Sequence, residues 1–259
     1  MRGIGWFSGG VTSAVAIKMA LDFGHDVDIY YFETNQHHPD HARFLKDCEN
    51  WYGQRIHIIH NKKAKSVHDI LRKGFINSPN GAYCTHLLKK KMRVELEKIV
   101  PYDFQIFGFE YEKKQINRAI RFEEQYPEAK AVFPLIELKL DKKQAMIELQ
   151  NAGIELPMMY KLGYSNSNCI GCVKGGMGYW NKIRVDFPDV FNEVAKIERQ
   201  VKRTCIKGKY LDELDPQAGR HEELSLPECG VVCPVELDGL KFLDNADLIQ
   251  NKLFIAEEK

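Results

Sequence analysis

Short apolar runs alternate with longer amphipathic segments through the first part of the chain. We expect strands at 4–7, 27–32, 56–59 and 104–107, and helices at 11–23, 41–52, 66–73 and 87–100. Strands that alternate with helices predict a parallel sheet covered by helices on both faces. The expected fold is therefore α/β, an open and mostly parallel twisted sheet. Four segments that follow the strands should meet at one ligand site: 8–13, 33–38, 60–65 and 108–114.

The second half of the chain has a different pattern. We expect an extended run at 131–140, a helix at 141–152, a loop at 157–167 and a helix pair within 178–203 that breaks near Pro188. Asp141 is the expected N-cap of the first of these helices, and Gly153 ends it. This pattern divides the chain into an α/β domain at 1–165 and a helical or irregular, Cys-bearing extension at 166–259, packed on the same domain.

The most informative loop follows the first expected strand, where residues 7–13 read Phe-Ser-Gly-Gly-Val-Thr-Ser. Glycine lets the backbone approach an anion closely, and the unpaired N–H groups of a helix start attract negative charge. Hydroxyl groups add further donors. The two glycines are adjacent and no lysine precedes the Ser or Thr, so the Walker pattern does not fit. We predict a phosphate-binding loop made of Ser8, Gly9, Gly10, Val11, Thr12 and Ser13.

Composition and charge narrow the classes of function. The 259 residues are 44% hydrophobic and 28% charged, with a net charge of +1, which is unlike a protein that grips a nucleic-acid duplex by itself. The basic runs at 62–65 and 89–93 are most simply solvated helix faces. We recognise no bilayer-spanning stretch and no signal peptide, and expect a cytoplasmic protein. The seven cysteines then indicate metal ligands, redox groups or core residues rather than disulfides.

Further segments carry a resemblance to a known family. They are Glu33-Thr34 with His38-Pro39, Cys84 with Lys89–Lys91, Phe107–Glu110 with Asn117–Ala119, and Gly163–Ser165 leading into Cys169-Ile-Gly-Cys172. With the loop at 8–13 they resemble the phosphoadenosine-phosphosulfate-reductase-like branch of the PP-loop superfamily, over residues 4–235. The resemblance implies that the loop holds the β,γ-pyrophosphate of ATP and that Arg118 contacts a phosphate. The implied further nucleotide contacts are Glu33, Thr34, Lys90, Gly108 and Phe109.

Two departures from the reductases of this branch are informative. Their substrate is an adenylyl sulfate without a pyrophosphate and their first loop is degenerate, whereas Ser8-Gly9-Gly10 is intact here. An ATP substrate, cleaved to AMP and pyrophosphate, is therefore favoured. The reductases also end in Glu-Cys-Gly-x-His, with a Cys that attacks sulfur. Here Glu228-Cys229-Gly230 is followed by two valines and Cys233, without the His.

The cysteines leave several alternatives open. Cys169-x-x-Cys172 is the strongest metal signal, because two thiolates at this spacing grip one metal or cluster. By resemblance, Cys84, Cys169 and Cys172 imply a [4Fe–4S] site with Cys229 or Cys233 as fourth ligand. Alternatively, Cys169, Cys172, Cys229 and Cys233 form a structural zinc site, or the thiols are free redox groups. Cys48 is an expected core residue, Cys205 has no assigned role, and His37 and His38 are candidate contacts for nucleotide or metal.

These implications combine into one hypothesis, in which ATP and Mg²⁺ adenylate an acceptor in a sulfur-transfer pathway. The chain looks most like the ATP pyrophosphatase subunit of DNA phosphorothioation systems of the Dnd or Ssp type. The expected partners are a cysteine desulfurase and other sulfur-transfer or DNA-handling subunits, with indirect contact to nucleic acid, no membrane and possibly a second copy of the chain. The alternatives are a tRNA thiolation enzyme, an adenylyl-sulfate reductase that uses Cys229, and a non-catalytic nucleotide-binding scaffold.

Overall fold

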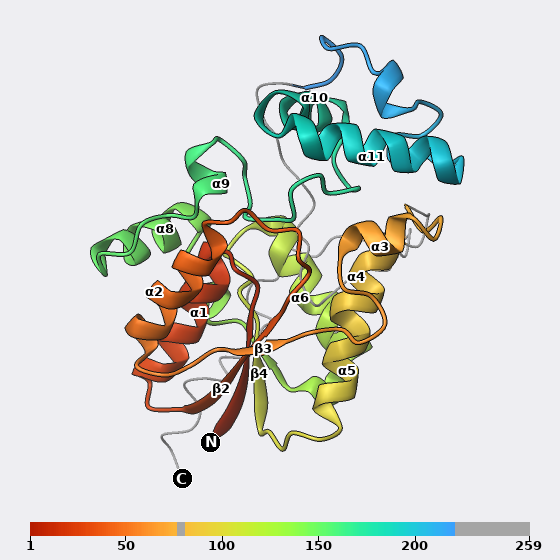
Figure 1. The fold of residues 1–259 in the computed structure, drawn as a ribbon. Helices are drawn as coiled ribbons and strands as arrows, with labels where there is room; N and C mark the ends of the chain where they lie inside the picture. Colours follow the sequence, from red (N-terminus) through yellow and green to blue (C-terminus); the bar gives the residue numbers. More distant parts are fainter. Residues whose placement is uncertain (77–80, 221–259) are drawn as a thin grey trace.

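Figure 1 shows the computed structural model of the chain, which describes residues 1–76 and 81–220. Five parallel strands form one sheet in the order β3-β2-β1-β4-β5. The strands are β1 Arg2–Phe7, β2 Asp26–Phe32, β3 His57–Ile59, β4 Phe104–Ile106 and β5 Ala131–Val132. In β1, Trp6 pairs with Tyr30 of β2, and Gly5 pairs with Ile106 of β4. The predicted α/β fold with an open parallel sheet is confirmed.

Helices cover both faces of the sheet. One face packs on α1 (Val11–Asp22), α2 (His41–Tyr52) and α8 (Lys142–Asn151), and the other on α5 (Lys91–Glu97) and α6 (Lys113–Gln125). Side chains of β1 alternate between the two cores, with Phe7 in the first and Ile4 and Trp6 in the second. Strands buried on both faces read as continuous apolar runs, which is why the sequence revealed them.

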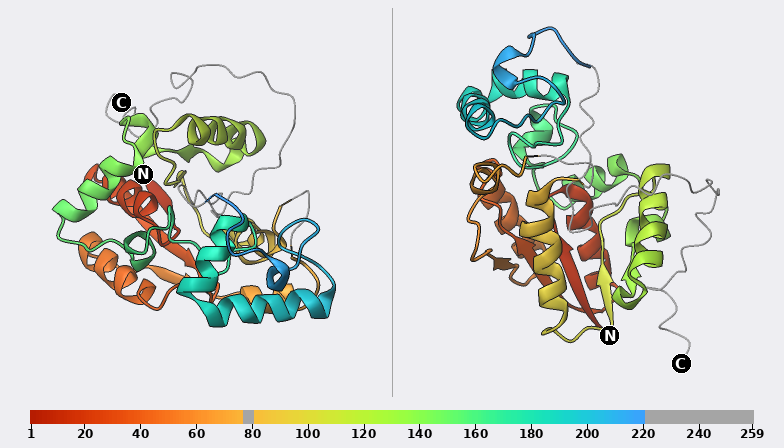
Figure 2. Two further views of the ribbon diagram at one scale, coloured as in Figure 1. Left: turned by 90° about the horizontal axis from the view of Figure 1, so that it is seen from above. Right: turned by 90° about the vertical axis from the view of Figure 1, so that its right-hand side faces the viewer.

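A third core lies beyond the carboxyl ends of the strands, in the upper part of Figure 1 and the right view of Figure 2. It surrounds Trp180, which is fully buried. The elements that build it are α3 (Val67–Leu71), α4 (Tyr83–Thr85), α10 (Met177–Asp186), α11 (Pro188–Val201) and the 3₁₀ turn η3 (Leu211–Glu213). Cys169, Cys172 and Cys205 are buried in this core and Cys84 packs against it, so we call it the cysteine core.

Several local predictions were confirmed. The side chain of Asp141 accepts a hydrogen bond from the backbone N–H of Gln144 (2.8 Å), and the Gln144 side chain accepts one from the N–H of Asp141. This capping box starts α8 where the sequence predicted a helix. Pro188 separates α10 from α11, because its ring suits the first helical turn and interrupts a helix interior.

Three local predictions were wrong. The extended run at 131–140 is a strand only at β5, because Pro134 opens the short helix α7 (Pro134–Glu137). The expected loop at 157–167 contains the helix α9 (Met158–Lys161). The helix expected at 87–100 starts earlier, with α4, and passes through a π-helical turn, η1 (His86–Lys90), into α5. Elsewhere the short η2 (Pro127–Ala129) follows α6.

Within the described part of the chain, none of the helices combines the length and the apolar character that crossing a membrane requires. The predictions for Cys229 and Cys233 fall on residues outside the described ranges.

Candidate functional site

The phosphate loop, residues 8–13, connects β1 to α1 at the carboxyl edge of the sheet. Gly10 is the N-cap of α1 and provides no side-chain cap, so the first N–H groups of the helix are left for a ligand. Gly9 has a φ of 78°, and a Cβ there would collide with the His41 ring. Both the left-handed backbone and the close approach require glycine at this position.

The serines of the phosphate loop hold the loop in shape. Ser13 Oγ accepts a hydrogen bond from the Ser8 backbone N–H (3.0 Å) and donates to the carbonyl of Gly10 (2.9 Å). The hydroxyls of Ser8 and Ser13 are 2.8 Å apart and share a further hydrogen bond. On the far side of the loop, a Cβ at Gly108 would strike the backbone of Ser13. Gly108 thus lets the end of β4 lie directly against the first turn of α1.

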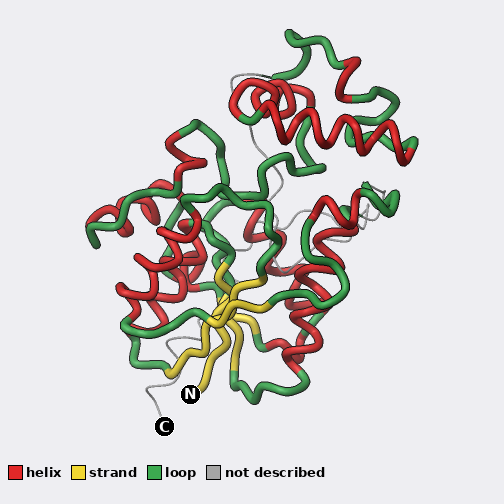
Figure 3. The backbone as a smooth tube through the Cα atoms, viewed as in Figure 1, coloured by secondary structure: helices red, strands yellow, loops and turns green. Residues whose placement is uncertain are grey.

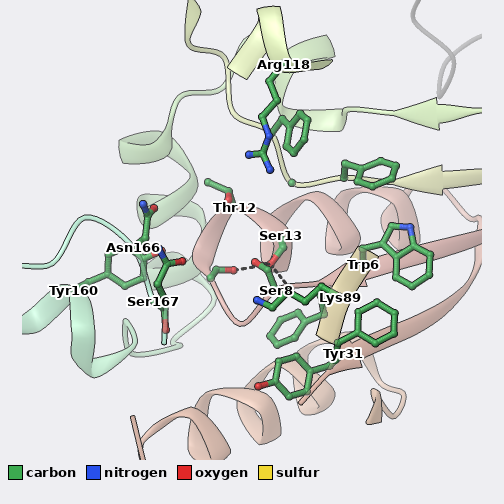
Figure 4. A pocket seen from close by; sticks show the side chains of 17 residues that line it. Trp6, Ser8, Thr12, Ser13, Tyr31, Lys89, Arg118, Tyr160, Asn166 and Ser167 are labelled. Carbon is green, nitrogen blue, oxygen red and sulfur yellow. Dashed lines mark hydrogen bonds between the residues drawn. The ribbon is translucent and has the colours of Figure 1, made fainter. Parts of the chain in front are cut away.

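A cleft opens in front of the phosphate loop (Figure 4), and we call it the nucleotide cleft. It encloses about 770 Å³, its open mouth included, which is within the range of small-molecule sites. Figure 3 shows loops filling the edge of the sheet where the strands end. The cleft residues outside the loop fall into an aromatic group and a polar group. These are Trp6, Phe7, Tyr31, Phe32, Phe107, Phe109 and Tyr160, and Lys89, Arg118, Asn166, Ser167 and Asn168.

Two cationic side chains line the nucleotide cleft, and each is at least nine-tenths buried. The Arg118 guanidinium lies over the Phe109 ring (4.3 Å), and Arg118 Nη1 donates to Gln115 Oε1 at 3.3 Å. Lys89 comes from η1, and Figure 4 places it beside Ser8. Buried cations next to uncapped helix N–H groups create a strongly anion-attracting site.

The lysine predicted to reach the nucleotide was the wrong one of a pair. Lys89 lines the cleft, whereas Lys90 is half-buried and lies over the Tyr126 ring at 5.4 Å. The physical reason is the π turn, in which hydrogen bonds span five residues and one extra residue changes the face of the helix that points inward.

Glu33 and Thr34, expected at the nucleotide, are not among the residues that line the cleft. The Glu33 carboxylate accepts hydrogen bonds from the backbone N–H groups of Thr34 and Asn35, both at 2.7 Å. Burial raises the Glu33 pKa, but these bonds and His37 outweigh it and lower the pKa to about 2. The Thr34 hydroxyl lies 3.2 Å from Cys169 Sγ. This segment therefore supports a cysteine at the edge of the cleft.

Cys169 directly follows the cleft residues Asn166, Ser167 and Asn168, and its thiol meets His37. Burial disfavours the thiolate, but the charge of His37 and its hydrogen bond, with Lys89 and Thr34, lower the Cys169 pKa. The same pairing raises the His37 pKa against the effect of burial. Tyr31 OH and His37 Nδ1 are 2.6 Å apart, which orients the imidazole. The arrangement stabilises a thiolate beside the nucleotide cleft.

The Cys-Ile-Gly-Cys turn is held by Tyr179. The Cys172 backbone N–H donates to the Tyr179 hydroxyl (2.9 Å), which is 3.3 Å from the Cys169 carbonyl. Gly171 has a φ of 73°, and a Cβ there would approach Val190 Cγ1 to 2.8 Å, so the turn requires glycine.

The structure brings together most of the predicted phosphate site. Ser8, Gly10, Thr12, Ser13, Gly108, Phe109 and Arg118 line the cleft. Gly9 and Val11 belong to the loop without lining the cleft, and residues 60–65 do not reach it. The sequence analysis missed the position of Lys89 and the contact between His37 and Cys169. His37 had one signal, its place after a strand end, whereas nothing local marked Lys89 over its neighbours.

Metal ligation was also predicted. Within residues 1–76 and 81–220, no three or more His, Cys, Asp or Glu residues are grouped so as to hold a metal ion. The donor chemistry of the cysteine core is nevertheless that of an iron–sulfur site, because its candidate donors are thiols in an apolar surrounding. In a cluster each thiolate binds a different iron, so the ligands are spread more widely than around one ion.

Fold and site together define an α/β protein of the PP-loop type. The family model of the phosphoadenosine phosphosulfate reductase domain matches residues 4–175, and the chain belongs to this family. Its members are enzymes of sulfur-related pathways that adenylate or reduce. The chain is similar to the U34-tRNA thiolase NcsA from Methanococcus maripaludis, solved with its [4Fe–4S] cluster. The match has 14% identity and a TM-score of 0.43, over 90% of this chain and 84% of that chain. No curated protein matches the chain.

Proposed function

We propose that the chain is an ATP pyrophosphatase that adenylates an acceptor in a sulfur-transfer pathway. The observation that carries this proposal is the intact phosphate loop, with Lys89 and Arg118 buried at the same cleft. An oxygen of the acceptor attacks the α-phosphorus of ATP, and the bond from that phosphorus to the bridging β-oxygen breaks. Pyrophosphate leaves and the acceptor carries AMP.

The phosphate loop binds the leaving group in this proposal. Negative charge grows on the β-phosphate as the bond breaks, and the N–H groups at the start of α1 lie where they stabilise it. Lys89 adds a positive charge beside Ser8. Mg²⁺ enters with ATP as part of the substrate and bridges phosphate oxygens, as hard cations do.

Arg118 steadies the α-phosphate. Its planar fork presents parallel N–H donors to two phosphate oxygens, and stacking on Phe109 fixes the plane of that fork. The aromatic wall formed by Trp6 and Phe32, whose rings stack with centroids 5.4 Å apart, suits the apolar faces of a purine.

The sulfur end of the reaction lies at the next turn of the chain. Cys169 follows the cleft residue Asn168, so sulfur held near Cys169 is close to the adenylated acceptor. A cluster bound by the cysteine core would supply a soft site that holds sulfur. Attack by sulfur on the activated centre then displaces AMP and leaves sulfur where the oxygen was.

The acceptor that we propose is a backbone phosphate of DNA, with sulfur supplied by a cysteine desulfurase. The near-neutral charge of +1 supports partner subunits that present the DNA, because a protein that binds DNA alone neutralises many phosphates. A thiolated tRNA base is the alternative acceptor, and both share the first step.

The first step is tested with purified chain, Mg²⁺ and ATP labelled at the α-phosphate, with and without acceptor and partner subunits. We expect labelled AMP and an equal amount of pyrophosphate. A second reaction offers adenylyl sulfate and a thiol reductant. Release of sulfite there, with no pyrophosphate from ATP under any condition, would show a reductase and reject the proposal.

A matched pair of arginines in α6 serves as the control. Arg118→Ala removes the cleft guanidinium and should lower kcat/KM for ATP cleavage about 10²-fold, as for loss of one transition-state donor. Arg121 follows one turn later and bonds the Asn117 carbonyl instead. Arg121→Ala should stay within about threefold of wild type, since it touches no cleft residue. Equal losses would contradict the assigned role of Arg118.

A further inference from the structure

Cys205 had no role in the sequence analysis, and the structure gives it a specific place. It lies 33 positions beyond Cys172 in the chain, in the segment between α11 and η3. Only 7% of the residue is exposed, and it belongs to the same core as Cys169 and Cys172. Cys84, from α4, packs against this core from the other side of the sequence.

The thiols of this core lie close enough to influence one another. Charge on Cys172 or on Cys84 acts directly on the Cys205 thiol, although the three residues come from separate segments. None of the three forms a disulfide. Apolar neighbours such as Trp180 and Leu211 surround them, so mutual repulsion of thiolates is poorly screened unless a cation or cluster sits among them.

A buried carboxylate fixes the position of Cys205. Glu198 is fully buried, and its two oxygens accept the backbone N–H groups of Cys205 (2.5 Å) and Leu211 (2.7 Å). Lys202, with a φ of 54°, ends α11 and turns the chain back toward this carboxylate. Burying a carboxylate is costly, and here it anchors the segment that carries Cys205. The thiol is therefore held in the core by the backbone around it.

We propose that Cys205 is the fourth ligand of an iron–sulfur cluster whose other ligands are Cys84, Cys169 and Cys172. This inference rests on the proposed function for the presence of a cluster, and it replaces Cys229 and Cys233 as the source of the last thiolate. Four thiolates give each iron of a [4Fe–4S] cube one protein ligand. Thr34 and His37 then hold the ligand nearest the nucleotide cleft.

The test uses the full chain, purified or reconstituted with iron and sulfide without oxygen. Iron, acid-labile sulfide and visible absorption are measured for wild type, Cys205→Ser, the Cys229→Ser/Cys233→Ser double variant and Cys48→Ser. Cys48 is an equally buried cysteine in a different core. We expect four irons per chain in every protein except Cys205→Ser. That variant should lose most of its iron or give the electron paramagnetic resonance signal of a three-iron cluster.

A ligand role and a packing role are separated in the cluster-free proteins. Thermal unfolding of chelator-stripped Cys205→Ser and wild type should coincide within a few degrees, because Ser fills nearly the same space. If Cys205→Ser is markedly less stable, Cys205→His decides the case: a ligand position should recover iron with altered resonance spectra, and a packing position should not. Glu198→Gln should weaken iron binding by about 10-fold, as loss of an outer hydrogen-bonding partner does.

Three outcomes would overturn the inference. They are a full cluster in Cys205→Ser, loss of the cluster in the Cys229→Ser/Cys233→Ser variant, or a colourless wild-type protein that binds stoichiometric zinc. Pyrophosphate release is measured on the same samples. A cluster that requires Cys205 in a protein without ATP cleavage would reject the proposed function alone, and ATP cleavage with an unchanged cluster in Cys205→Ser would reject this inference alone.

Discussion

The phosphate loop and the cysteine core are built in opposite ways. The phosphate loop is one continuous stretch, residues 8–13, whose own glycines and serines set its shape. The cysteine core gathers Cys84, Cys169 with Cys172, and Cys205 from three distant segments. A site made of neighbouring residues is encoded locally, whereas a site made of distant residues exists only after the chain has packed. The two should therefore respond differently to substitution.

The largest expected effect is at the phosphate site. Lys89→Met removes a buried cation beside the loop and should lower kcat/KM for ATP cleavage by about 10²–10³, equivalent to about 3–4 kcal/mol. Lys90→Met, one residue along the same helical turn, should leave kcat/KM within about threefold of wild type. Steady-state kinetics of pyrophosphate release measures both variants. A larger loss in Lys90→Met would mean that the π turn does not set which lysine faces the cleft.

The next effect separates backbone conformation from close packing. Gly9 and Gly24 share a φ of 78°, but a Cβ meets the His41 ring at Gly9 and open space at Gly24. Gly24→Ala should cost about 1 kcal/mol of unfolding free energy, and Gly9→Ala about 3 kcal/mol because steric collision adds to strain. Urea unfolding measures stability, and calorimetry measures pyrophosphate binding, which only Gly9→Ala should abolish. Equal costs would show that His41 yields freely.

A smaller effect depends on pH and concerns the support beneath Cys169. The Glu33 pKa is lowered to about 2, chiefly because His37 and the Asn35 N–H outweigh the effect of burial. A depressed carboxyl pKa stabilises the fold above its unfolded value, and this stabilisation is lost as pH falls from about 4.5 toward 2. Glu33→Gln should remove about 2 kcal/mol of that pH dependence.

The pH dependence is measured by urea unfolding at several pH values. Glu95→Gln, at an exposed position of α5, is the control, and its stability curve should run parallel to that of wild type. Parallel curves for Glu33→Gln and wild type would show that Glu33 does not stabilise this segment as a carboxylate.

The smallest effects compare two capping boxes, one beside each site. Asp141 starts α8, which packs on α1, and Ser66 starts α3, which contributes to the cysteine core. Each change to Ala should cost about 1 kcal/mol of stability. Asp141→Ala should weaken pyrophosphate binding slightly and leave iron content unchanged, and Ser66→Ala should do the reverse. If each variant affected both sites equally, the two regions would be one cooperative unit.

The sequence by itself predicted the sheet, most helices and the phosphate loop. Apolar runs marked the strands, Asp141 and Pro188 marked helix boundaries, and adjacent glycines marked the loop. Each of these signals lies within a few residues of the structure that it specifies, because hydrogen bonds, backbone conformation and capping act between near neighbours. The family resemblance named Cys84, Cys169 and Cys172 on the same local basis.

Tertiary structure alone decided which side chains face the site. The π turn placed Lys89 rather than Lys90 in the cleft, and packing directed Thr34 and His37 to Cys169 instead of a nucleotide. The position of Cys205 depends on Glu198 and on the way α11 folds back over the core. Such contacts join residues far apart in sequence, and only the closed, space-filling core determines their distances and orientations.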